Sequence, residues 1–204
     1  RMSADPALPT LAIDGLSLDL PRFAAVVRGA ARPVLADAAR ERIAFARAEI
    51  ERAANGTAAV YGVNTGFGNL AEVRIDRADL ETLQERLVLS HAAGIGEPLA
   101  EEEVRGMLLL RANTLSRGHS GVRVELVERL LAMLAAGVHQ IVPSRGSVGA
   151  SGDLAPLAHL ALPLLGHGEA IFRGERLPGA AAMARAGLEP LRLAAREGLG
   201  LING

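Results

Sequence analysis

Three neighbouring residues, Ala150, Ser151 and Gly152, can react with one another within the segment GSVGASGDLAPLAH at 146–159. If the backbone bends sharply there, the Gly152 amide nitrogen can attack the Ala150 carbonyl carbon and close a five-membered ring with loss of water. Glycine suits the attacking position because it has no side chain and tolerates unusual backbone angles. Loss of the Ser151 hydroxyl as a second water leaves an exocyclic methylidene. The product is 4-methylidene-imidazol-5-one, a strong electrophile.

Two other interpretations of the same segment were weighed. The first is an ordinary glycine-rich loop followed by a helix, with Asp153 as the N-cap residue. The second is a phosphate-binding loop, but the spacing of a Walker A motif and its lysine are missing. The self-modifying loop is favoured because companion motifs occur elsewhere in the chain.

The elements that must position this loop are predicted to be mainly helical. Apolar spacing predicts helices over 34–54, 77–90, 101–117 and 122–136, with a further helix after Asp153. Cap candidates are Asp76 and Ser120 at helix starts, Gly137 after the fourth helix, and a left-handed stop at 55–56. Segments 61–69 and 145–152 are predicted loops. Hairpins are predicted over 11–20, around Asp14-Gly15, and over 169–177, around Arg173-Gly174.

Composition fits a globular domain rather than a membrane or nucleic-acid-binding segment. Of the 204 residues, 50% are hydrophobic, which is enough for a sizeable core, and the formal net charge is -1. There is no cysteine, so disulfides and thiolate sites are excluded. Apolar runs are too short to cross a bilayer, and no secretory signal opens the chain. We therefore expect a cytoplasmic protein with no nucleic-acid or membrane partner. The apolar faces indicate a helical bundle with oligomer contacts.

Four segments together resemble the aromatic amino acid ammonia-lyase family, and within it the histidine ammonia-lyases. They are YGVNTGFG at 61–68, SHAAG at 90–94, the segment at 146–159, and LING at 201–204. The resemblance implies the helical N-terminal portion of an ammonia-lyase bundle, spanning 1–204, with a prosthetic-group loop at 143–153. It also implies that family members continue beyond Gly204 into long helices and assemble as homo-oligomers, tetramers at full length. The alternative is a non-catalytic fragment or assembly domain of such a lyase.

The resemblance assigns roles to residues of this chain. The ring would form from Ala150-Ser151-Gly152 without an external cofactor, and Tyr61 would handle the proton removed from the substrate. His91 would orient the substrate side chain, and Asn203 would hold the ring or the substrate carboxylate. Without the resemblance, Tyr61 is equally typical of a buried structural tyrosine, His91 of a histidine at a helix end, and Asn203 of a helix cap. The remaining histidines lack metal-ligand spacing and are interpreted as structural; they are His119, His139, His159 and His167.

The implied reaction is non-oxidative elimination of ammonia from L-histidine, giving urocanate, the first step of histidine degradation. Phenylalanine lyases resemble a GTITASGDL pattern, whereas this chain has GSVGASGDL at 146–154. It also has Ser90-His91 where those lyases place apolar residues. Tyrosine or phenylalanine ammonia-lyase and aminomutase activity remain the alternatives, with tyrosine as runner-up.

Overall fold

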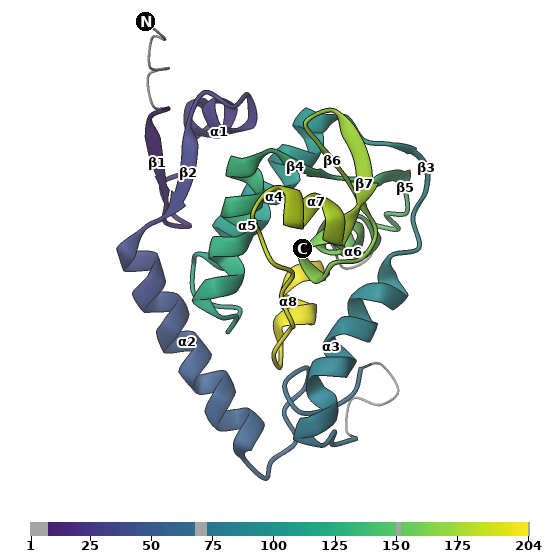
Figure 1. Ribbon diagram of the computed structural model, residues 1–204. Helices are drawn as coiled ribbons and strands as arrows, with labels where there is room; N and C mark the ends of the chain where they lie inside the picture. The colour runs from purple at the N-terminus through teal and green to yellow at the C-terminus, as the bar shows by residue number, and fades with distance from the viewer. Residues whose placement is uncertain (1–7, 68–72, 150–151, 204) are drawn as a thin grey trace, which may run out of the picture.

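The fold is mainly α, as predicted, in a computed structural model that describes residues 8–67, 73–149 and 152–203 (Figure 1). The helices are α1 (Leu20–Val27), α2 (Asp37–Asn55), α3 (Arg77–His91), α4 (Glu101–Leu115), α5 (Val124–Ala136), α6 (Leu154–Ala161), α7 (Gly179–Arg185) and α8 (Glu197–Ile202), with a short 3-10 helix at Pro163–Leu165. The strands are β1 (Thr10–Ile13), β2 (Arg32–Leu35), β3 (Ile95–Pro98), β4 (Val138–Gln140), β5 (Pro143–Arg145), β6 (Glu169–Phe172) and β7 (Glu175–Pro178).

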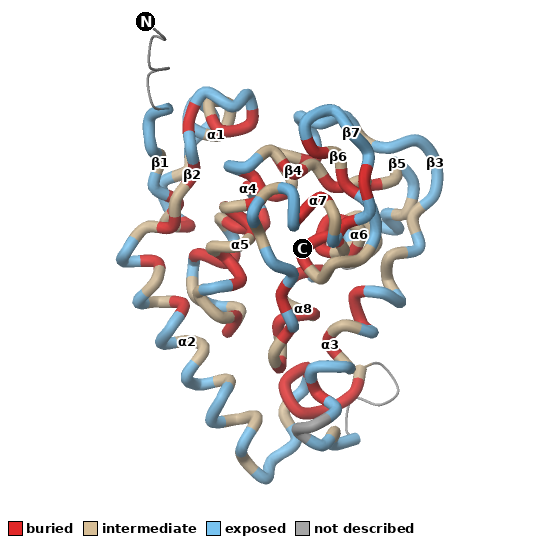
Figure 2. Tube along the Cα trace, in the orientation of Figure 1, coloured by how far each residue is buried: buried red, intermediate tan, exposed pale blue. Residues whose placement is uncertain are grey.

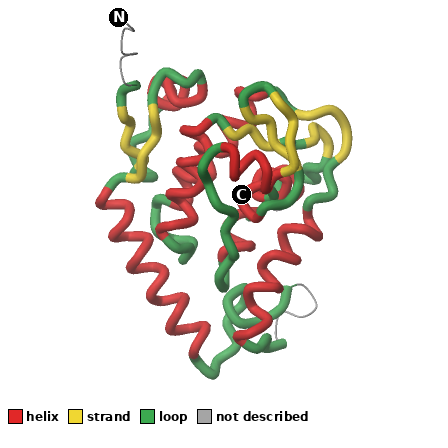
Figure 3. The backbone as a smooth tube through the Cα atoms, viewed as in Figure 1, coloured by secondary structure: helices red, strands yellow, loops and turns green. Residues whose placement is uncertain are grey.

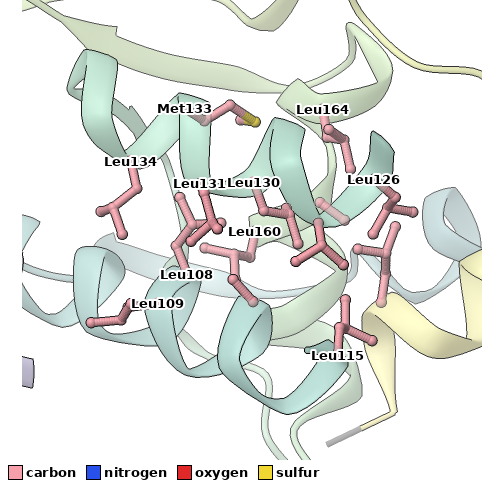
Figure 4. Close-up of a cluster of buried hydrophobic side chains, with 14 of the residues drawn as sticks. Leu108, Leu109, Leu115, Leu126, Leu130, Leu131, Met133, Leu134, Leu160 and Leu164 are labelled. Carbon is pink, nitrogen blue, oxygen red and sulfur yellow. The ribbon is translucent and has the colours of Figure 1, made fainter. Parts of the chain in front are cut away.

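The core lies where α4, α5 and α6 pack together (Figure 4). Leucines at helical spacing, such as Leu108 and Leu115 of α4 and Leu126 and Leu130 of α5, are fully buried there. Leu160 brings α6 into the same cluster. Burying a leucine side chain contributes about 2 kcal/mol, so this cluster holds the α6 scaffold rigidly behind the loop at 146–153.

The predicted hairpin at 11–20 is wrong. The Asp14 carboxylate does accept the amides of Leu16 and Ser17, both at 2.8 Å, and makes a tight turn. The chain then enters α1 instead of returning, and β1 pairs in parallel with β2, with Ile13 opposite Leu35. A turn signal shows where a chain bends but not which strand it will meet.

Helix α2 forms a long arm that is mostly exposed along its length (Figure 2). The predicted helix at 34–54 starts later, at Asp37, because residues 34 and 35 belong to β2. It ends at Asn55 as expected, but Gly56 is extended, with φ of -74° and ψ of 171°, so the left-handed stop is wrong. No helix among the described residues is long and apolar enough to cross a membrane.

The strands gather at the end of the molecule opposite the tip of α2 (Figure 3). The predicted hairpin at 169–177 is confirmed: β6 and β7 are antiparallel around Arg173-Gly174, and β4 adds to β6. Strand β5 starts the predicted prosthetic-group loop and pairs with β3. This pairing ties the loop to the segment that leaves α3.

Four further cap predictions can be compared with the structure. Two are confirmed in position only, one is confirmed fully and one is wrong. Asp76 and Asp153 occupy the N-cap positions of α3 and α6, but neither side chain accepts a capping hydrogen bond. Gly137 ends α5 in the left-handed conformation, as predicted. Ser120 does not cap α5, whose N-cap residue is Arg123. The Arg123 amide donates to a remote carboxylate, Glu197 Oε1, at 2.8 Å, so local sequence could not reveal this cap.

Candidate active site

The loop before α6 contains two glycines in the left-handed backbone conformation. Gly149 and Gly152 have φ of 65° and 79°, values that residues with a Cβ rarely adopt. The Ser147 hydroxyl donates to the Asp153 carboxylate and closes the loop across its base. Ala150 and Ser151, the other members of the predicted triad, lie outside the described residues. The described ends of the loop therefore fit a tight turn at the start of α6.

The turn after α3 packs directly on this loop. A Cβ on Gly146 would lie 3.0 Å from the Gly94 Cα and 3.3 Å from the Ala155 Cβ, so a side chain there would press against both neighbours. The Gly94 amide donates to His159 Nε2 at 2.9 Å. The SHAAG motif, the loop and α6 thus meet at Gly94.

His91, the last residue of α3, has a ring orientation fixed by its own helix. Its Nδ1 lies 2.8 Å from the Leu87 carbonyl oxygen and 3.2 Å from Ser90 Oγ. Because a carbonyl oxygen only accepts, Nδ1 carries the hydrogen. In the neutral ring Nε2 is then a hydrogen-bond acceptor, which suits a substrate that brings an N–H or O–H group.

The segment containing Tyr61 is the ordered loop that its glycines predicted, as far as residue 67. The residue that links this loop to its neighbours is Asn64, which is only 1% exposed. The Asn64 side chain accepts the Val60 amide at 2.7 Å and donates to the carbonyls of Ala53 and Ala58 at 3.2 and 2.9 Å. Sequence reasoning missed this role, although the asparagine stands inside the motif. The side chain joins the end of α2 to the loop.

Tyr61 itself is half exposed, at 51%, and packs edge-on against Phe67 with ring centroids 6.0 Å apart. Its carbonyl accepts from Arg196 Nη1 at 3.2 Å. A Cβ on Gly62 would lie 2.8 Å from Leu199 Cδ2, so the loop rests closely on α8. An exposed phenol on a fixed backbone is available to a substrate.

Asn203 follows α8 directly as its C-cap residue and is exposed. Its carbonyl accepts from Arg111 Nη1 at 3.0 Å, and the Gly200 carbonyl lies 3.3 Å from the same atom. Arg111 is buried in α4, and burial lowers the pKa of its guanidinium. A cation is favourable at a helix C-terminus, where unpaired carbonyls gather. Arg111 therefore holds Asn203 in place, a role that sequence reasoning missed.

The start of α8 is held by a buried carboxylate. Glu197 accepts from the Arg123 amide, Nε and Nη2 at 2.8, 3.0 and 2.8 Å, and from the Ala194 amide at 2.7 Å. Hydrogen bonding to Glu197 raises the pKa of Arg123. The Gly198 amide donates to Gln84 Oε1 of α3 at 2.9 Å. These bonds attach α8 to α5 and α3.

The structure therefore brings together the elements that carry all four motifs. Helices α3, α6 and α8 pack against one another, and the loop at 61–67 rests on α8. His91 ends α3, Gly152 precedes α6 and Asn203 follows α8. Two of the histidines interpreted as structural are paired with carboxylates: His139 with Glu101 at 3.0 Å and His167 with Glu85 at 2.6 Å.

Comparison with known proteins relates the chain to lyases. A sequence model described as aromatic amino acid lyase matches residues 18–204. The histidine ammonia-lyase of Anaeromyxobacter sp. (strain K) is 57% identical over 204 residues, covering 97% of this chain and 40% of the relative. The histidine ammonia-lyase of Gloeobacter violaceus is 58% identical over 194 residues, covering 95% and 38%. The chain thus spans about 40% of the length of the curated relatives it matches.

Solved structures agree with this relationship. The crystal structure of histidine ammonia-lyase from Trypanosoma cruzi superposes with a TM-score of 0.87 at 41% identity, covering 96% of this chain and 37% of that one. A tyrosine aminomutase with bound ligand gives a TM-score of 0.87 at 35% identity, covering 96% and 36%. With the family match extending over nearly the whole chain, this protein belongs to the aromatic amino acid lyases.

Proposed function

We propose that this chain forms the N-terminal part of a histidine ammonia-lyase, which eliminates ammonia from L-histidine and gives urocanate. The observation that carries the proposal is the close approach of Gly94 to Gly146, which supports a site shared by the turn after His91 and the loop that would form the ring. The relatives at 57–58% identity that are named histidine ammonia-lyases support the choice of substrate.

The described residues fit a prosthetic ring made from Ala150-Ser151-Gly152. Gly152 has the left-handed backbone and the bare Cα that suit a cyclising nitrogen, and the Ser147–Asp153 hydrogen bond keeps the loop ends together. The ring would supply an electrophile that binds the substrate covalently and makes its amine a better leaving group. Its place before α6 would put it at the positive end of a helix dipole, which increases electron demand.

Other residues of the chain bind and orient the substrate in this proposal. Tyr61, a residue that is 51% exposed, takes up the β-proton at its phenol oxygen. The Asn203 side chain holds the ring or the substrate carboxylate, with its backbone fixed by Arg111. His91 accepts the substrate imidazole N–H at Nε2, because Nδ1 is committed to Leu87.

The His91 geometry also supports tyrosine as the second candidate substrate. A phenol O–H can donate to Nε2 as an imidazole N–H can, whereas a phenylalanine side chain has no donor. The tyrosine aminomutase at 35% identity favours this candidate, but the identity to histidine ammonia-lyases is much higher. Histidine is therefore the proposed substrate, with tyrosine ahead of phenylalanine.

The test uses the full-length product of the gene that carries this sequence. Intact mass should show a deficit of two waters within residues 150–152, and L-histidine should give urocanate absorbance. Release of coumarate from L-tyrosine without urocanate would transfer the proposal to the second candidate. The unmodified mass together with no turnover of any of the three amino acids would overturn it and favour the assembly-domain alternative.

The substitution His91→Leu should reduce kcat/KM for L-histidine by about 10- to 100-fold, because one buried hydrogen bond to the substrate is lost. The urea midpoint of unfolding should change little, since among the described residues the ring bonds are to Leu87 and Ser90 of its own helix. The matched control is His119→Leu, an exposed histidine elsewhere, which should leave kcat/KM unchanged. Equal losses of activity and stability in His91→Leu would remove its proposed role.

We further infer that the enzyme acts in the cytoplasm as a homo-oligomer, at the first step of histidine degradation. Exposed apolar side chains on separate helices, Phe45 of α2 and Leu110 of α4, support burial by further protein. Light scattering on the full-length protein should give a mass several times that of one chain, and a monomer would contradict this inference.

A further inference from the structure

His159 connects three parts of the candidate site although it stands two turns into α6. Its Nε2 accepts the Gly94 amide at 2.9 Å, and a Cβ on Gly94 would lie 3.1 Å from both Nε2 and Cδ2. Gly94 is three residues beyond His91, and the Ala93 amide is already bonded to the His91 carbonyl at 2.8 Å. The hydrogen bond to His159 therefore holds the backbone directly after the turn that begins at His91.

We propose that His159 is a positioning residue for substrate binding: its neutral imidazole holds the Gly94 amide and so fixes His91 against the ring-forming loop. The expected effect on kinetics rests on the proposed function, whereas the hydrogen bond is present in the structure whatever the substrate is. In this proposal His159 does not contact the substrate. Its contribution should appear in substrate affinity rather than in the chemical step.

The bond requires one protonation state of His159. An imidazole accepts at Nε2 only when that nitrogen is bare, so a protonated ring would point an N–H at the Gly94 N–H and break the contact. Burial lowers the pKa of His159 from its ordinary value of 6.5, which keeps the accepting form at neutral pH. The folded protein binds this proton less readily than the unfolded chain. The contribution of neutral His159 to the free energy of unfolding is therefore complete above pH 6.5, and it is lost as the pH falls from 6.5 toward the lowered pKa.

The charged groups near His159 are few in the described part of the chain. The cavity that it lines also contains Glu97 of β3, Glu169 of β6 and Arg176 of β7. Glu169 and Arg176 form an ion pair with each other, with Nε 3.1 Å from Oε1. Glu97 is exposed, and the other packed surfaces, such as Leu162, are apolar. Burial rather than a neighbouring charge therefore governs the protonation of His159.

Two substitutions separate the hydrogen bond from simple packing. His159→Phe keeps a flat ring and removes the acceptor, whereas His159→Gln keeps an acceptor that does not titrate. In the full-length protein, His159→Phe should raise KM for L-histidine about 10-fold, while kcat and the two-water mass deficit change little. His159→Gln should restore KM at neutral pH. As the pH falls toward the lowered pKa of His159, kcat/KM of the His159→Gln protein should rise relative to that of wild type. Taking the ratio of the two proteins cancels the titration of the substrate.

A second readout is independent of activity. Hydrogen exchange measured by mass spectrometry should show the Gly94 amide protected in wild type and His159→Gln, and exposed in His159→Phe. Unprotected Gly94 in wild type, or an unchanged KM in His159→Phe, would overturn the proposal. So would equal losses of kcat and of the mass deficit in both variants, which indicate a purely structural histidine. Protection that follows this pattern in a protein without histidine turnover would instead refute only the proposed function.

Discussion

Replacing Ser151 with alanine should abolish the two-water mass deficit of the full-length protein and remove urocanate formation, with turnover falling on the order of 10³-fold or more. The reason is chemical: alanine has no hydroxyl to lose as the second water, so no methylidene can form. Without that electrophile, the remaining residues can bind L-histidine but cannot make its amine a good leaving group. The measurement is intact mass with peptide mapping of 146–159, followed by the absorbance assay.

Two other serines provide graded controls for Ser151→Ala. Ser144, exposed on β5, should tolerate alanine with the full mass deficit and normal turnover. Ser147→Ala removes the hydrogen bond to Asp153 that closes the loop, so the ring should form in a smaller fraction of molecules. Retention of the two-water deficit in Ser151→Ala would show that another residue supplies the lost hydroxyl, and the assignment of the triad would fail.

Elements specified by local patterns could be predicted from the sequence. The hairpin of β6 and β7 depends on a turn at Arg173-Gly174 between two short strands, and α3 starts at Arg77, where its periodicity indicated. The parallel pairing of β1 with β2 was not predictable in this way. This pairing joins residues about 22 positions apart, such as Ile13 and Leu35, and it requires that the segment linking the two strands along the chain contain α1.

The same distinction applies to the candidate site. The four motifs identified the segments, because the residues to which the proposal assigns ring formation and substrate contact are close together in sequence within each motif. The bonds that assemble those segments join distant residues: Gly94 with His159, and Asn203 with Arg111. Neither His159 nor Arg111 differs in local sequence from an ordinary helix residue. Their roles depend on what the fold places opposite them.

The largest expected effect on stability is at Glu197, whose side chain is 0% exposed. Its carboxylate accepts three hydrogen bonds from Arg123 and one from the Ala194 amide. Glu197→Ala leaves the Arg123 guanidinium without its buried counter-charge and two backbone amides without acceptors. Breaking one side of a fully buried pair costs about 3–5 kcal/mol in free energy of unfolding. The Arg123 side chain is 32% exposed, so urea denaturation followed by circular dichroism should show a loss near the lower end of that range.

The matched control is Glu125→Gln, because Glu125 approaches the same arginine at 3.5 Å but is 53% exposed. Solvent screens that pair, so the substitution should cost less than about 1 kcal/mol. The double change Arg123→Met with Glu197→Leu should recover part of the loss, since it removes both charges instead of orphaning one. If Glu197→Ala were as mild as Glu125→Gln, the start of α8 would not depend on this carboxylate. The packing of α8 against α3 and α6, together with the hydrogen bond from Arg111, would then hold Asn203 in place.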